Sequence, residues 1–76
     1  MSAPQLTIQL NGQQHVFKEL TSPVNLVQVI DSLGLKTDRI AVEHNGEIAP
    51  RATWSQARVA TGDHLEIVHF VGGGTT

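Results

Sequence analysis

The stretch IAVEHNGEIAPR, residues 40–51, contains the clearest turn signal in the chain. Asn45-Gly46 supplies the two positive φ angles of a type I′ turn, the strongest short-range hairpin signal. Ile40–His44 therefore predicts a strand, and Glu47–Ala49 predicts a short strand that returns beside it. Pro50 cannot donate a hydrogen bond to a ladder, so the returning strand is expected to be short or to lie at a sheet edge.

A second hairpin is predicted earlier in the chain. Apolar and polar residues alternate over Leu6–Leu10, which is typical of a strand with one buried face. Asn11-Gly12 repeats the turn signal, and Gln13–Lys18 is expected to return as the second strand. The pattern leaves open whether Val16 or Phe17 faces inward.

Between the hairpins the spacing of apolar residues becomes helical. Ser22 is a good N-cap, Pro23 suits the first helical position, and Gly34 suits the residue that follows a helix. The sequence therefore predicts one amphipathic helix over about Pro23–Leu33.

The last third of the chain predicts one more strand. Ala52–Ala60 is expected to be irregular, with a helical turn around Trp54, and His64–Phe70 is predicted as the last strand. The order is hairpin, helix, hairpin and strand, which favours an α+β fold with one main helix on a mixed sheet of four or five strands. This order matches the β-grasp, or ubiquitin-like, arrangement, in which the first and last strands pair in parallel at the sheet centre.

Composition and charge exclude several classes of function. The 76 residues include no cysteine, which excludes disulfides, Cys-based metal sites and a thiol nucleophile. The formal net charge is −2 and no basic patch is present, so no nucleic-acid partner is expected. No apolar run is long enough for a membrane span and no secretory signal is present, so we expect a cytoplasmic protein. A catalytic cleft is hard to build at this size, which favours a carrier or binding role over an enzyme.

The chain ends in a glycine run, Gly72-Gly73-Gly74, followed by Thr75-Thr76. Glycine has high backbone freedom and no side chain, so such a segment can thread a channel that a Cβ atom would block. We therefore expect a folded domain over residues 1–71 and a flexible tail over residues 72–76. On composition alone, a frayed terminus is the alternative.

Two segments together resemble the ThiS family of sulfur carriers. Residues 41–51, followed by Trp54, are similar to the family's V-N-x-x-x-x-P-R hairpin, with His44 in place of the commoner apolar residue. Residues 62–74, GDHLEIVHFVGGG, are similar to the family's G-D-x-[LIV]-E-[IV]-V…G-G ending. The resemblance extends from Leu6 to Gly74.

The resemblance implies a protein co-substrate with no active site and no bound cofactor of its own. In such carriers a ThiF-like enzyme uses ATP to adenylate the terminal glycine, and a sulfur donor protein supplies sulfur for a thiocarboxylate. Thiazole synthase then takes that sulfur to build the thiazole of thiamine. This implies attachment at Gly74, with Gly72, Gly73 and Gly74 threading the partners' active sites. A carrier for molybdopterin, cysteine or tRNA thiolation, a ubiquitin-like conjugation tag and a binding-only module are the alternatives.

Thr75-Thr76 depart from the family pattern, because family members end at the second glycine. A carboxyl group held in an amide at Gly74 cannot be adenylated, so we expect a C-terminal peptidase to remove both threonines first. An addition to the natural chain and a loss of carrier function are the other interpretations.

Strand alternation also predicts a surface for partner docking. If Leu65 and Ile67 face the core, Val68 and Phe70 point to the sheet face that a single helix leaves uncovered. Exposed apolar side chains often mark interaction sites, so Val68, Phe70 and Val71 are expected to dock partners. The alternative is that Phe70 folds back onto the core.

The remaining residues with reactive or aromatic side chains are expected to lie on the surface or in the core. The histidines lack the helical spacing of metal ligands, so no metal site is expected. The alternative is a metal site formed where three of them meet across strands: His44, His64 and His69. Trp54 is expected to cap the core edge, with a cation–π contact to Arg51 as an option.

Overall fold

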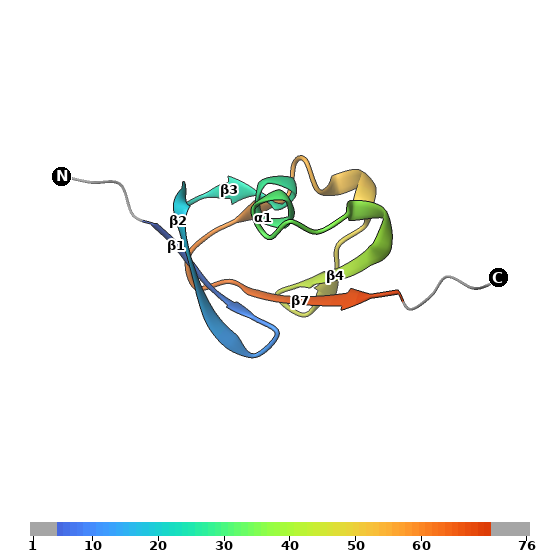
Figure 1. Ribbon diagram of the computed structural model, residues 1–76, viewed down its shortest axis with the longest axis horizontal. Coiled ribbons are helices and arrows are strands. Elements are labelled where there is room, and N and C mark those ends of the chain that lie inside the picture. The colour runs from blue at the N-terminus through green and yellow to red at the C-terminus, as the bar shows by residue number, and fades with distance from the viewer. Residues whose placement is uncertain (1–4, 71–76) are drawn as a thin grey trace.

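The computed structural model describes residues 5–70, which form a five-stranded sheet and a helix on one of its faces (Figure 1). A two-stranded ribbon lies beside the helix. The order of hairpin, helix, hairpin and strand predicted from the sequence is confirmed. In chain order the elements are β1 (Gln5–Leu10), β2 (Gln13–Thr21), β3 (Val24–Asn25), α1 (Leu26–Ser32), the 3₁₀ helix η1 (Thr37–Arg39), β4 (Ile40–His44), β5 (Glu47–Ile48), the 3₁₀ helix η2 (Arg51–Thr53), β6 (Arg58–Val59) and β7 (His64–His69).

The strand order in the main sheet is β2-β1-β7-β4-β5. β1 and β7 are parallel at the centre, where Gln9 pairs with His64 and Leu10 with Leu65. The other neighbouring strands are antiparallel. The central parallel pair expected of a β-grasp fold is therefore confirmed, and β7 is the strand at the middle of the sheet.

Both Asn-Gly turns have the predicted backbone conformation. Asn11 and Asn45 have φ angles of 51° and 52°, and the glycines that follow them also have positive φ. Each asparagine side chain also bonds to β7. The Asn11 amide donates to the Ile67 carbonyl at 3.3 Å and accepts from the Ile67 N–H at 2.7 Å. Asn45 Oδ1 accepts from the His64 N–H at 2.8 Å. The two turns therefore fasten both sides of the central strand.

The helix begins later than the sequence predicted, at Leu26 instead of Pro23. Asn25 is the N-cap in place of Ser22: its Oδ1 accepts from the Gln28 N–H at 2.8 Å, and Gln28 Oε1 accepts from the Asn25 N–H at 3.1 Å. This reciprocal capping box satisfies two N–H groups that the first turn leaves unpaired. Val24–Asn25 pair with β6 instead of joining the helix.

The core is built from side chains of α1 and of the sheet strands, the two layers that Figure 1 shows one over the other. Phe17 is buried and Val16 is 42% exposed, which resolves the inward parity of β2. Among residues 5–70, every buried side chain is apolar: Leu6, Ile8, Phe17, Val24, Leu26, Val29, Ile30, Ile40, Val42, Trp54, Val59, Leu65 and Ile67.

In the same range, no helix has both the length and the apolar character needed to cross a bilayer.

Candidate functional site

The candidate site is the surface around β7, because this strand runs toward the glycine run. β7 ends at His69, and the next residue is still held by the sheet, since the Phe70 N–H donates to the Arg39 carbonyl at 2.9 Å. The predicted site residues Val71, Gly72, Gly73 and Gly74 lie outside the described residues, as do Thr75-Thr76 and the domain boundary expected after residue 71. The structure therefore describes the strand from which the tail starts.

The sheet face opposite α1 is open, and β7 presents apolar side chains on it. Leu65 and Ile67 are buried, whereas Val68 and Phe70 are 61% and 55% exposed. The alternation predicted for the last strand is confirmed, and Phe70 does not fold back onto the core. Exposure alone does not test docking, so the docking role of these side chains stays a prediction.

The strand register adds Ile48 to this face. Ala41 lies opposite Val68 in the β4–β7 pair, and Ile48 lies opposite Glu43 in the β4–β5 pair. Opposite residues of antiparallel strands share a face. Ile48 is 69% exposed and lines the same hollow as Val68. The sequence reasoning missed Ile48, although a two-residue turn at Asn45-Gly46 fixes this register.

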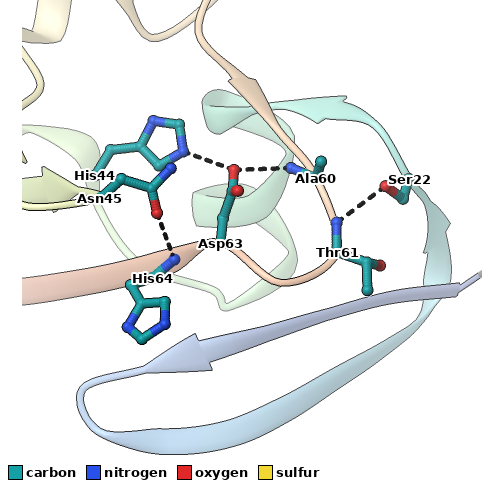
Figure 2. Close-up of polar contacts among 7 residues, drawn as sticks. All are labelled: Ser22, His44, Asn45, Ala60, Thr61, Asp63 and His64. Atoms are coloured by element: carbon teal, nitrogen blue, oxygen red, sulfur yellow. Dashed lines mark hydrogen bonds and ion pairs between the residues drawn. The ribbon is translucent and has the colours of Figure 1, made fainter.

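Asp63 holds the turn that leads into β7 (Figure 2). Its Oδ2 accepts from the Ala60 N–H at 3.0 Å and lies 2.8 Å from His44 Nε2 at the end of β4. Partial burial acts to raise the pKa of Asp63. The hydrogen bonds from Ala60, His44 and Asn45 outweigh that effect and hold the pKa below its ordinary value. Asp63 is therefore anchored as a carboxylate.

The same turn is tied to the end of β2. The Thr61 N–H donates to Ser22 Oγ at 3.0 Å, as Figure 2 shows. On the other side of β7, the Asn45 side chain holds the first residue of the strand, His64 (Figure 2). Together with Asp63, these contacts fix the start of β7 to both hairpins.

The histidines do not gather into a site. His44 contacts Asp63, and the His15 ring packs against Phe17 with 4.4 Å between ring centroids. In the part of the chain that the structure describes, no three His, Cys, Asp or Glu side chains are grouped as metal ligands. The cross-strand histidine site considered from the sequence is therefore not seen among these residues.

Trp54 supports the second hairpin from inside the core. It is 2% exposed, so the prediction that it caps the core edge is wrong, since the side chain belongs to the core itself. Its Nε1–H donates to the Ala49 carbonyl at 2.7 Å. The Arg51 guanidinium lies 5.8 Å from the ring centroid, within cation–π range, which confirms that option.

Comparison with known proteins agrees with the fold described above, and the family match includes the glycine run. The sequence profile of the ThiS family matches residues 8–74. The sulfur carrier protein ThiS of Bacillus subtilis is 34% identical over 67 residues, which cover 88% of this chain and 98% of that protein. The thiazole synthase of Paramagnetospirillum magneticum is 36% identical over 66 residues, which cover 87% of this chain and 19% of the enzyme. A thiazole synthase from Magnetococcus marinus gives a similar match, so the chain spans about a fifth of the length of these two enzymes.

Solved structures give the same result. The crystal structure of a thiamine biosynthesis protein (ThiS) from Geobacter metallireducens has a TM-score of 0.78 and 26% identity, and covers 91% of this chain and 100% of that one. A solution structure of a thiamine biosynthesis protein from the same organism has a TM-score of 0.74 and 25% identity, over 93% of this chain and 91% of that one. The resemblance drawn from the two sequence segments is confirmed, and the chain belongs to the ThiS family of sulfur carrier proteins.

Proposed function

We propose that this carrier delivers sulfur for thiazole formation in thiamine biosynthesis, in the cytoplasm, as a thiocarboxylate on Gly74. The observation that supports this most is the extent of the family match, which continues through the glycine run and ends at residue 74. The carrier is a co-substrate that is used and regenerated, and the chemistry is performed by its partners.

The proposed chemistry follows from the reactivity of a carboxylate. A free carboxylate is a poor electrophile because it has no good leaving group. A ThiF-like enzyme attaches AMP from ATP to the terminal carboxylate and releases pyrophosphate. A persulfide sulfur of a donor protein then attacks the activated carbonyl carbon, and AMP leaves. A thiol next attacks the resulting acyl disulfide, which releases the Gly74 thiocarboxylate and forms a disulfide on the donor side. No cysteine of the carrier competes for the acyl-adenylate, because the chain has none.

Removal of Thr75-Thr76 is part of the proposal. In the full chain the Gly74 carbonyl is in a peptide bond to Thr75, so no carboxylate exists there to be adenylated. We propose that a C-terminal peptidase hydrolyses this bond. The two threonines lie outside the family match, which supports their removal before activation.

Thiazole synthase is the proposed consumer of the sulfur. In two relatives the segment similar to this chain is part of a protein named thiazole synthase, which supports a physical link between carrier and enzyme. The exposed side chains of Val68 and Phe70, with Val71 next along the chain, are proposed to dock the partners.

Mass spectrometry tests this function directly. The full chain and a chain that ends at Gly74 are each incubated with the ThiF-like enzyme, ATP and a sulfur donor. We expect the oxygen-to-sulfur mass change only in the chain that ends at Gly74, and loss of that change when thiazole synthase and its substrates are added. No mass change in the shortened chain contradicts the carrier role. Branched lysine adducts support a conjugation tag instead. A change that persists with thiazole synthase indicates another sulfur pathway.

A further inference from the structure

Two glutamates lie opposite each other on neighbouring strands of the open sheet face. Glu43 of β4 and Glu66 of β7 are direct partners in the antiparallel register. The side chains beside them, Val42 and Ile67, point into the core, so both glutamates point to the open face. Direct cross-strand neighbours have Cβ atoms about 4.5–5.5 Å apart, and like charges in such a pair are destabilising.

No cation of the described chain offsets this pair. All five Lys and Arg residues lie within residues 5–70. Across that range, none has a nitrogen within 4.0 Å of a carboxylate oxygen of Glu43 or Glu66. Other acidic side chains do have partners: Glu19 accepts from the Ser32 hydroxyl at 2.6 Å, and Asp63 contacts His44. Among residues 5–70, no Lys or Arg side chain therefore forms an ion pair with Glu43 or Glu66, although the His64 ring lines a hollow with both of them.

Apolar side chains border the pair on one side. Ile48 lies opposite Glu43, and Val68 follows Glu66 on the same face of β7. These four side chains and Ala41 line one shallow hollow. On the other side, both glutamates line a second hollow together with Asn45, Gly46 and His64. The pair thus has apolar side chains on one side and polar side chains on the other.

We propose that this face binds a partner protein through an arginine side chain that lies between Glu43 and Glu66, with apolar partner side chains on Ile48 and Val68. This inference rests on the carrier function proposed above, and the partner we assign is the adenylating enzyme. Arginine fits better than lysine because its planar guanidinium presents several N–H donors in a fork and can bond two carboxylates at once. It is also the less strongly hydrated cation, which suits a site with an apolar border.

The position of the pair suits a carrier. Glu66 and Val68 lie on β7, and Gly74 is the sixth residue after Val68. Six residue steps span at most roughly 20 Å when fully extended. A partner that holds Glu66 and Val68 therefore confines the terminal carboxylate to a short radius around its own reaction centre.

The test compares two double variants in the chain that ends at Gly74. Glu43→Gln/Glu66→Gln removes the pair and keeps the side-chain shapes. Asp31→Asn/Glu47→Gln is the control, because it makes the same change in charge away from the open face. Asp31 lies on α1, and Glu47 is the residue of β5 that pairs with His44. Affinity for the purified adenylating enzyme is measured by calorimetry at several salt concentrations. Melting temperatures are measured for the free chains.

We expect the Glu43→Gln/Glu66→Gln chain to bind about tenfold more weakly and with a weaker dependence on salt, whereas the control stays within about twofold of the unsubstituted chain. The pair variant should melt at the same or a higher temperature, because a like-charge repulsion is removed. Weaker binding together with a retained melting temperature excludes misfolding as the cause.

Equal affinity of the two double variants overturns the inference. An equal loss in both also overturns it, because it indicates general attraction of an acidic protein and no defined site. These failures differ from failure of the proposed function, since the unsubstituted chain would still gain sulfur on Gly74. No binding and no sulfur gain by the unsubstituted chain overturns both.

Discussion

Replacement of Asp63 by alanine should destabilise the fold by about 2 kcal/mol. The carboxylate accepts from the Ala60 N–H at 3.0 Å and contacts His44 Nε2 at 2.8 Å, and both contacts are partly buried. A typical net contribution is about 1 kcal/mol for each such hydrogen bond, and Asp63→Ala removes both. For a domain of this size, 1 kcal/mol corresponds to about 4–8 °C in melting temperature, so we expect a loss of about 8–16 °C.

The same variant should change how stability depends on pH. The hydrogen bonds to Asp63 hold its pKa below the ordinary value in the folded protein. Such a group contributes stability that is fully present above its unfolded pKa of about 3.9 and is lost as the pH falls through the lower folded pKa. The deficit of Asp63→Ala relative to the unsubstituted chain should therefore be largest near about pH 7 and should shrink below about pH 4.

Urea unfolding at several pH values, followed by circular dichroism, measures both effects. Asp38→Asn is the control, since it removes an exposed acidic side chain from η1. The reasoning is refuted if Asp63→Ala loses less than about 0.5 kcal/mol at neutral pH, the range of ordinary surface changes. It is also refuted if the deficit stays constant at low pH.

Three other changes test the anchoring of the fold and the exposed face. Asn25→Ala removes the capping box and should cost about 1 kcal/mol in urea unfolding; an unchanged midpoint contradicts the assignment of this N-cap. Asn11→Ala removes both bonds to Ile67 and puts alanine at a φ of 51°, so it should cost about 2–3 kcal/mol, and Asn11→Gly about 1 kcal/mol less. Equal losses for the two would show that backbone conformation at this turn contributes nothing. Phe70→Ala should change stability by less than about 0.5 kcal/mol while weakening binding to the adenylating enzyme, and unchanged affinity in calorimetry would remove Phe70 from the docking surface.

The strands and turns were predictable because their signals are local. A positive φ at Asn11 and Asn45 is a property of the turn itself, and apolar alternation along β1 and β7 follows from the two-residue period of a strand. These signals were enough to obtain both hairpins and the last strand. The order of the elements matched the β-grasp arrangement, which supplied the expectation of a parallel central pair, and the register of β1 and β7 confirms it.

The helix start was mispredicted because two N-cap signals compete within four residues. Ser22-Pro23 and Asn25 with Gln28 both fit the rules for a helix start, and only tertiary contacts decide between them. The Ser22 hydroxyl accepts from Thr61, and Val24–Asn25 pair with β6, so the helix begins after this ribbon. A ribbon of two residues per strand is too short to leave a periodic pattern in the sequence.

The candidate site, too, was predictable from the sequence only in part. Exposure of Val68 and Phe70 followed from alternation along one strand, so the sequence predicted it. The place of Ile48 opposite Glu43 follows from the two-residue turn at Asn45-Gly46, so the sequence reasoning could have found it. The Glu43–Glu66 pair depends on how β4 aligns with β7, which alternation within each strand does not fix, so it is visible only once the sheet is assembled.

The central place of β7 connects these features to the proposed role. β1 and β4 hold the strand on both sides, the side chains of Asn11 and Asn45 add bonds along it, and Phe70 still bonds to the main chain of Arg39. A central strand is hydrogen-bonded on both sides, whereas an edge strand is bonded on one side only. β7 should therefore stay in the sheet when a partner binds the residues that follow it. Under the proposed function, recognition and delivery use the same strand: its outward side chains form the proposed docking surface, and the chain after it leads to Gly74, the proposed site of sulfur attachment.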